Sequence, residues 1–130
     1  MSSIKVIKTS NAPEPVGPYN QALKAGGFIY CSGQIAIDPV SNEINCLGNI
    51  KEETTQVLKN LLAVLKAGGA EPKDVIKTTI YLTDLTNFQT VNSIYSDFFK
   101  VDVPPARACV EVSSLPKGVS IEIDCVAFLD

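Results

Sequence analysis

Histidine is absent from the 130 residues of this chain. Its absence excludes a Ser-His-Asp triad, a Cys-His pair, a histidine general base and a metal site built on histidine. No apolar run approaches the roughly 20 residues of a membrane-spanning helix, and no glycine-rich phosphate-binding motif is present. Any chemistry must therefore use carboxylates, arginine, lysine, tyrosine, cysteine or backbone groups.

Basic residues are too few for a dedicated nucleic-acid binder. Eleven lysines and arginines stand against fourteen acidic residues, which gives a formal net charge of −3, whereas nucleic-acid binding calls for a basic face. The length matches one compact domain of roughly 100–150 residues. We therefore expect residues 1–130 to form a single domain that needs no metal or disulfide to fold.

The four cysteines form no C-x-x-C pair, so a zinc ribbon is not expected. They are Cys31, Cys46, Cys109 and Cys125. The first fifteen residues do not resemble a signal peptide. We therefore expect reduced thiols in a cytoplasmic protein, with a mitochondrial location left open for a eukaryotic source.

Hydrophobic periodicity predicts two helices. The first spans Asn49–Ala67, with Asn49 and Glu52 as a capping box and glycines directly after its end. The second spans Thr86–Lys100, with Thr86 and Gln89 at its cap. Five segments rich in β-branched and aromatic residues are predicted as strands: Ile4–Lys8, Phe28–Ile37, Val75–Thr83, Ala106–Val112 and Val119–Phe128.

This order of elements predicts an α+β fold with one sheet and two helices packed on one of its faces. The first two strands are expected to be joined through Gln21–Gly26, and the last two are expected to pair as a hairpin. No further helix is available to cover the second face of the sheet. We therefore expect copies of the chain to cover this face in a homo-oligomer, most simply a closed ring.

The alternation of side chains along a strand shows which of the potentially reactive residues share a face. Arg107, Cys109 and Glu111 share one face of their strand, and Glu122 and Asp124 share one face of the last strand. In the expected hairpin, Arg107 approaches a carboxylate, and a structural ion pair of roughly 0.2–1 kcal/mol is the simpler interpretation. The alternative is that Arg107 holds a substrate carboxylate with two hydrogen bonds while a glutamate activates water.

Other candidates also have two interpretations. Tyr19 ends a proline-rich loop and is either a surface tyrosine or part of a cleft, and Asn92 on the second helix faces either solvent or a site. Ser32–Gly33 lies within a strand, where glycine indicates a bulge or the close approach of another group. Cys109 has no histidine or lysine nearby in sequence to lower the pKa of its thiol, which favours an inert packing thiol.

Several short motifs occur in a characteristic order along the chain. They are Gly17-Pro18-Tyr19, Ser32-Gly33-Gln34-Ile35, Lys77-Thr78-Thr79, the helix from Val91-Asn92 to Phe98-Phe99, Pro105-Ala106-Arg107-Ala108-Cys109-Val110, Leu115-Pro116-Lys117-Gly118 and Ile121-Glu122-Ile123. Together they resemble the RidA (YjgF) family of reactive intermediate deaminases over essentially the whole chain. The resemblance implies a chorismate-mutase-like fold and a homotrimer with clefts between subunits.

The resemblance also implies an activity and a set of site residues. The activity is hydrolysis of enamines and imines, such as 2-aminoacrylate, 2-iminopropanoate and 2-iminobutanoate, to 2-keto acids and ammonia without a metal or an organic cofactor. Arg107 would bind the substrate carboxylate, and Glu122 would orient the attacking water. The residues implied to line the cleft are Tyr19, Ser32, Gly33, Asn92 and, through its backbone, Cys109.

This sequence differs from the family pattern at Ala36, where proline is frequent, and at Asp124, where glutamate is common. Two alternative functions stay open. One is a regulatory protein that binds small carboxylates without turnover. The other is an endoribonuclease or translation inhibitor, which the acidic balance and the lack of histidine disfavour.

Overall fold

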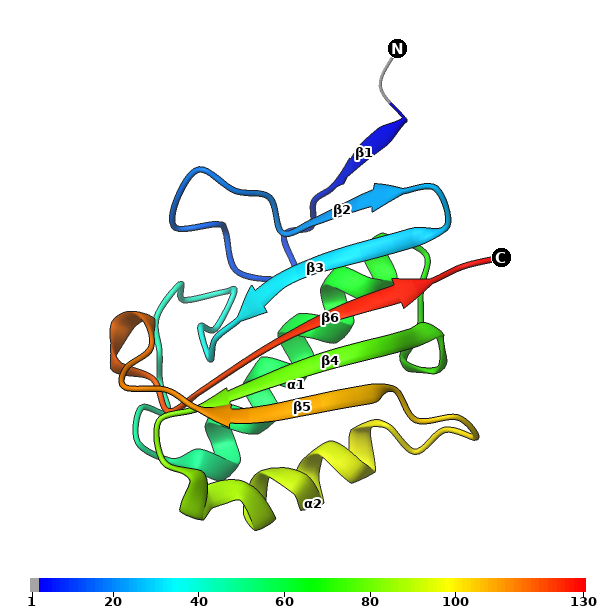
Figure 1. Cartoon of the computed structure of the whole chain (residues 1–130). Coiled ribbons are helices and arrows are strands. Elements are labelled where there is room, and N and C mark those ends of the chain that lie inside the picture. Colours follow the sequence, from blue (N-terminus) through cyan, green and yellow to red (C-terminus); the bar gives the residue numbers. More distant parts are fainter. Residues whose placement is uncertain (1–2) are drawn as a thin grey trace.

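The structure is a computed structural model that describes residues 3–130, and its strands form one six-stranded sheet. Both α-helices lie on the same face of this sheet (Figure 1). The strands are β1 (Ile4–Ile7), β2 (Ala22–Ala25), β3 (Phe28–Gln34), β4 (Val75–Leu82), β5 (Ala106–Glu111) and β6 (Ile121–Phe128). The helices are α1 (Ile50–Ala67) and α2 (Phe88–Phe98), with short 3-10 turns at Pro72–Asp74, Leu85–Asn87 and Pro116–Gly118. The predicted α+β class with two helices on one face is confirmed.

Helix α1 begins and ends as the sequence predicts. The side chain of Asn49 accepts a hydrogen bond of 3.1 Å from the backbone N–H of Glu52, which satisfies one of the free donors of the first turn. At the other end, the N–H of Ala70 reaches the carbonyl of Leu65 at 2.8 Å, and Gly69 has a φ of 86°. This is the left-handed glycine ending of a Schellman motif.

Helix α2 begins later than predicted. A 3-10 turn at Leu85–Asn87 precedes the α-helix, and it is capped by Asp84, whose carboxylate accepts a hydrogen bond of 2.9 Å from the N–H of Thr86. The N-cap residue of α2 itself is Asn87, whose side chain makes no capping bond. The predicted cap of Thr86 and Gln89 is therefore wrong. An aspartate side chain readily accepts hydrogen bonds from backbone N–H groups close by in sequence. Asp84 lies two residues before Thr86, so the turn begins at Asp84 and not at Thr86.

The predicted hairpin between the last two strands is also wrong. The strand order is β1-β2-β3-β6-β4-β5, with β5 parallel to β4 and β6 antiparallel to both β3 and β4. Residues 112–120 therefore cross the end of β4, where Val112 N–H bonds the Leu82 carbonyl and Thr83 N–H bonds the Ser120 carbonyl. Adjacent strands lie about 4.8 Å apart, so this connection is long enough to pass over one strand. The local sequence does not distinguish such a crossover from a hairpin.

Strand β2 was predicted only as part of a connection. Its sequence, Ala-Leu-Lys-Ala, contains none of the β-branched or aromatic residues that favour strands. It is nevertheless hydrogen-bonded between β1 and β3. Hydrogen bonding to β1 and β3, and not the intrinsic strand propensity of its residues, therefore makes this segment a strand.

The second face of the sheet, called the open face below, carries no helix from the part of the chain that the structure describes (Figure 1). Phe28 and Phe128 are in ring contact on it at 5.0 Å between centroids, and Tyr30 is 52% exposed. Contiguous exposed aromatic groups of this kind mark interaction surfaces in soluble proteins. Within residues 3–130, no helix combines the length and apolarity needed to cross a membrane.

Asn60 connects α1 to the segment that follows β3. Its buried amide donates hydrogen bonds to the carbonyls of Ile35 at 3.0 Å and Ile37 at 2.8 Å. These bonds fix the path of a chain segment that has left the sheet.

We predict that Asn60→Leu lowers the free energy of unfolding by roughly 2–4 kcal/mol, because two buried carbonyls lose their donors. Urea denaturation measures the change. Lys59→Ala, at an exposed position of the same helix, is the control and should change stability by less than about 0.5 kcal/mol. Equal stability of Asn60→Leu and wild type would contradict this role.

Candidate functional site

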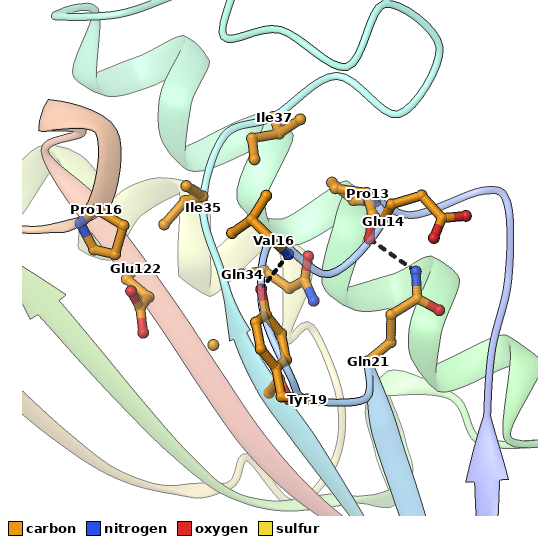
Figure 2. A pocket seen from close by; sticks show the side chains of 12 residues that line it. Pro13, Glu14, Val16, Tyr19, Gln21, Gln34, Ile35, Ile37, Pro116 and Glu122 are labelled. Carbon is orange, nitrogen blue, oxygen red and sulfur yellow. Dashed lines mark hydrogen bonds between the residues drawn. The ribbon is translucent and has the colours of Figure 1, made fainter.

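One pocket of about 350 Å³ gathers four of the predicted site residues: Tyr19, Ser32, Gly33 and Glu122. It lies between the proline-rich loop, the end of β3 and β6 (Figure 2). Its other lining residues are Pro13, Glu14, Val16, Gln21, Gln34, Ile35, Ile37 and Pro116. The volume falls in the range of small-molecule sites, roughly 300–1,000 Å³.

Gly33 explains how β3 and β6 meet at this pocket. The pairing of the two strands shifts register between Cys31 and Gln34, so the expected bulge at Ser32–Gly33 is confirmed. A Cβ placed on Gly33 would collide with Oε2 of Glu122. Glycine at this position therefore leaves room for the Glu122 carboxylate directly against the backbone, and a larger residue would displace that carboxylate.

The loop that carries Tyr19 is held by a buried side chain. The amide of Gln21 accepts from the N–H of Thr9 at 2.8 Å and donates to the carbonyls of Thr9, Ala12 and Pro13. The Tyr19 hydroxyl accepts a hydrogen bond of 3.3 Å from the N–H of Val16 (Figure 2). Sequence reasoning missed Gln21, because nothing local distinguishes a buried glutamine from an exposed one.

Ser32 connects the end of β3 to the loop that carries Tyr19. Its hydroxyl donates a hydrogen bond of 2.6 Å to the carbonyl of Asn20, and its backbone N–H bonds the carbonyl of Gln21 at 2.9 Å. Both bonds tie the end of β3 to the Tyr19 loop. The serine therefore fixes the distance between two walls of the pocket.

Glu122 is the pocket residue best suited to proton transfer. Burial, and secondarily the neighbouring Asp124 carboxylate, raise the pKa of Glu122 above its ordinary value. Asp124 in turn accepts a hydrogen bond of 3.2 Å from the Tyr81 hydroxyl. A carboxylate with a raised pKa takes up a proton more readily near neutral pH, as a general base requires.

Arg107 lies elsewhere, on the helix-covered side of the edge strand β5. It donates a hydrogen bond of 2.6 Å to Oδ1 of Asn92, and its guanidinium stands 4.9 Å from the centroid of the Tyr95 ring and 5.5 Å from that of Phe88. The Tyr95 hydroxyl shares a hydrogen bond of 2.7 Å with Thr78. The expected ion pair of Arg107 with a carboxylate across a hairpin is wrong, and Asn92 does not simply face solvent.

Cys109 follows Arg107 on the same face of β5 and packs against the core. Burial raises the pKa of its thiol, against the smaller opposing effect of Arg107. A raised pKa leaves little thiolate at neutral pH, which agrees with a packing thiol. The cysteines in the described part of the chain are free, and no cluster of three or more metal-binding side chains occurs there.

The predicted site residues thus form two groups on opposite faces of one sheet. Ile121 and Ile123 are fully buried beneath the helices, so Glu122 between them points to the open face. Arg107 contacts α2 on the covered face. Strand β4 also separates their two strands. One chain therefore does not bring Arg107 and Glu122 together, and the roles assigned to them stay predictions.

Comparison with known proteins gives consistent matches over nearly the whole chain. A family model described as endoribonuclease L-PSP matches residues 9–129. The chain is 50% identical over 127 residues to the RutC family protein slr0709 of Synechocystis, covering 98% of each. It is 47% identical over 129 residues to the human 2-iminobutanoate/2-iminopropanoate deaminase, covering 98% of this chain and 93% of the human protein. A Rid-family protein of unknown function from Yersinia pestis superposes with a TM-score of 0.94 at 45% identity, covering 97% of this chain and 99% of that one.

We predict that Asp124→Asn lowers the pKa of Glu122, because a negative charge that opposes ionisation of Glu122 is removed. Asparagine keeps an oxygen that can accept from Tyr81. Carbon-13 NMR titration of the Glu122 carboxyl measures the shift. Asp102→Asn, at an exposed position between α2 and β5, is the control; an unchanged Glu122 titration in Asp124→Asn would contradict this account.

Proposed function

Since the chain belongs to the Rid (YjgF) family of endoribonuclease L-PSP-type proteins, we propose that it hydrolyses 2-imino acids to 2-keto acids and ammonia. The observation that supports this most directly is Arg107, whose guanidinium is fixed in place with no acidic partner among residues 3–130. The 47% identity to a human protein named as a 2-iminobutanoate/2-iminopropanoate deaminase points to the same reaction.

Arg107 is the group proposed to bind the substrate carboxylate. Asn92 and two aromatic rings hold its guanidinium, and within residues 3–130 it forms no ion pair. Its remaining N–H groups are therefore available for two parallel hydrogen bonds to a carboxylate. Because asparagine and aromatic faces orient the cation without neutralising it, the site suits an anionic ligand.

Glu122 is the group proposed to activate water. Water adds to the imine carbon, and the electron pair of the C=N double bond moves to nitrogen. Glu122 accepts a proton from the water and returns it to the nitrogen, which gives a carbinolamine. Glu122 then carries the proton of the carbinolamine hydroxyl to the amino nitrogen as the C–N bond breaks, so that ammonia leaves and the keto group forms. An imine is already electrophilic, so positioning and modest proton transfer are sufficient without a strong nucleophile.

A homotrimer with clefts between subunits is proposed as the working unit. Arg107 and Glu122 lie on opposite faces of one sheet, so a complete site requires two copies of the chain. The exposed aromatic groups of the open face support self-association, and closed cyclic symmetry repeats the same contact at each interface. In such a ring, Arg107 of one copy faces the Tyr19–Glu122 pocket of the next.

We predict that the protein accelerates the disappearance of 2-iminopropanoate generated by an amino acid oxidase. Arg107→Ala should lower kcat/KM by roughly a hundredfold to a thousandfold, because two charge-assisted hydrogen bonds are lost. Lys100→Ala, an exposed cation beyond the end of α2, is the control and should retain full activity.

Three results would contradict the proposal. They are no acceleration by wild type, equal acceleration by wild type and Arg107→Ala, and calorimetric binding of 2-ketobutyrate without turnover of the imine. The last result would select the carboxylate-binding regulator instead.

A further inference from the structure

One buried carboxylate has no part in the proposed chemistry. Glu53, in the first turn of α1, is fully buried, whereas glutamate side chains of soluble proteins are almost always exposed unless they are paired. One of its oxygens, Oε1, accepts a hydrogen bond of 2.8 Å from the N–H of Ser120, and the other, Oε2, accepts one of 2.9 Å from the N–H of Gly48. Hydrogen bonds from backbone N–H groups to a carboxylate are short and strong, so these two contacts hold the backbone at both residues.

The two hydrogen bonds of Glu53 join segments that are distant in the sequence. Gly48 lies in the loop between β3 and α1, and Ser120 ends the segment that crosses from β5 to β6. The first turn of α1 and the start of β6 lie at the same end of the sheet (Figure 1). Glu53 therefore fixes the point at which β6 enters the sheet relative to α1.

The segment held by Glu53 supplies two residues to the pocket. Glu122 lies two residues after Ser120 and Pro116 lies four residues before it, and both line the cavity (Figure 2). The Glu122 carboxylate already lies close against Gly33, so it has little room to compensate for a displaced backbone. The position of its oxygens therefore depends on where β6 begins.

The same segment also contacts the opposite wall of the pocket. Val119, directly before Ser120, is buried in one cluster with Ile35 and Ile37, and both isoleucines line the pocket. Without Glu53, the N–H of Ser120 loses its partner, and the backbone around it has to move to reach another acceptor or water. Such a movement displaces β6 relative to the rest of the pocket.

We propose that Glu53 is a positioning residue that, by holding the N–H of Ser120, places the Glu122 carboxylate for water activation. This inference rests on the proposed function for the role of Glu122. It requires a side chain of the right length with an acceptor oxygen, and it does not require the negative charge. A displacement of about 1 Å at a reacting group can lower the rate by roughly a hundredfold. Arg107 lies on the opposite face of the sheet, so binding of the substrate carboxylate should not depend on Glu53.

The test compares three substitutions of Glu53 in the whole protein. Glu53→Ala should lower kcat for 2-iminopropanoate by roughly tenfold to a hundredfold and leave the Kd of 2-ketobutyrate, measured by calorimetry, within about threefold of wild type. Glu53→Gln keeps the length and an acceptor oxygen and should retain at least about a third of kcat. Glu53→Asp keeps the charge but is one methylene shorter, so its kcat should fall towards that of Glu53→Ala.

The same three substitutions at Glu52 are the matched controls. Glu52 lies in the same turn of α1, and its side chain is exposed. These variants should therefore leave kcat unchanged.

Titration of Glu122 tests the positioning without turnover. Burial holds the pKa of Glu122 above its ordinary value, and a movement of β6 that exposes the carboxylate to water lowers that pKa. Carbon-13 NMR should therefore give a lower pKa of Glu122 in Glu53→Asp than in wild type. Because Glu53→Asp retains the negative charge, this fall cannot come from the loss of a charge near Glu122.

The outcomes separate this inference from the proposed function. Wild-type kcat and an unchanged titration of Glu122 in Glu53→Asp would overturn the positioning role, and so would a kcat of Glu53→Gln as low as that of Glu53→Asp. If Glu53→Ala does not fold, the comparison of Glu53→Asp with Glu53→Gln decides alone. Absence of turnover by wild type, together with a lowered pKa of Glu122 in Glu53→Asp, would reject imine hydrolysis and support the positioning of Glu122.

Discussion

Arg107 is held on the covered side of the sheet by Asn92 and two aromatic rings, whereas Glu122 points to the open side between two isoleucines buried beneath the helices. This separation follows from strand alternation together with the insertion of β6 between β3 and β4. Among residues 3–130, the arginine on the edge strand forms no ion pair, and no lysine or arginine lines the pocket of the glutamate. In the proposed function these two groups are halves of one site, which self-association of the chain would join.

Each half-site is rigid for a different reason. Around Arg107, the Thr78–Tyr95 hydrogen bond fixes one of the rings that stack on the guanidinium. Around Glu122, the pocket depends on buried amides: Gln21 holds the Tyr19 loop, and Asn60 holds the segment after β3. Gly33 then lets the Glu122 carboxylate lie against the backbone. The bonds of these polar groups fix the cavity before a ligand binds, so specificity can arise from its shape and charge.

The sequence predicted features that depend on local rules and missed those that depend on distant pairing. Asn49 at the start of α1, the glycines at its end, the face shared by Arg107 and Cys109, and the bulge at Gly33 each follow from a residue and its immediate neighbours. Strand β2 lacks strand-forming residues, and residues 112–120 fit a hairpin or a crossover equally well, so neither was predictable. Gln21 and Asn60 were missed because their importance comes from burial, which sequence alone does not reveal for an isolated polar residue.

The central claim is that one copy supplies Arg107 and another supplies Glu122 to the same site. The most direct measurement mixes Arg107→Ala and Glu122→Gln copies in equal amounts, after reversible dissociation, and follows 2-iminopropanoate hydrolysis. Each site then has one chance in two of receiving an intact arginine and one in two of receiving an intact glutamate. The mixture should therefore recover about a quarter of wild-type activity, far above the roughly hundredth or less expected of Arg107→Ala alone. A mixture of exchanged subunits that is no more active than either variant alone would contradict a shared site.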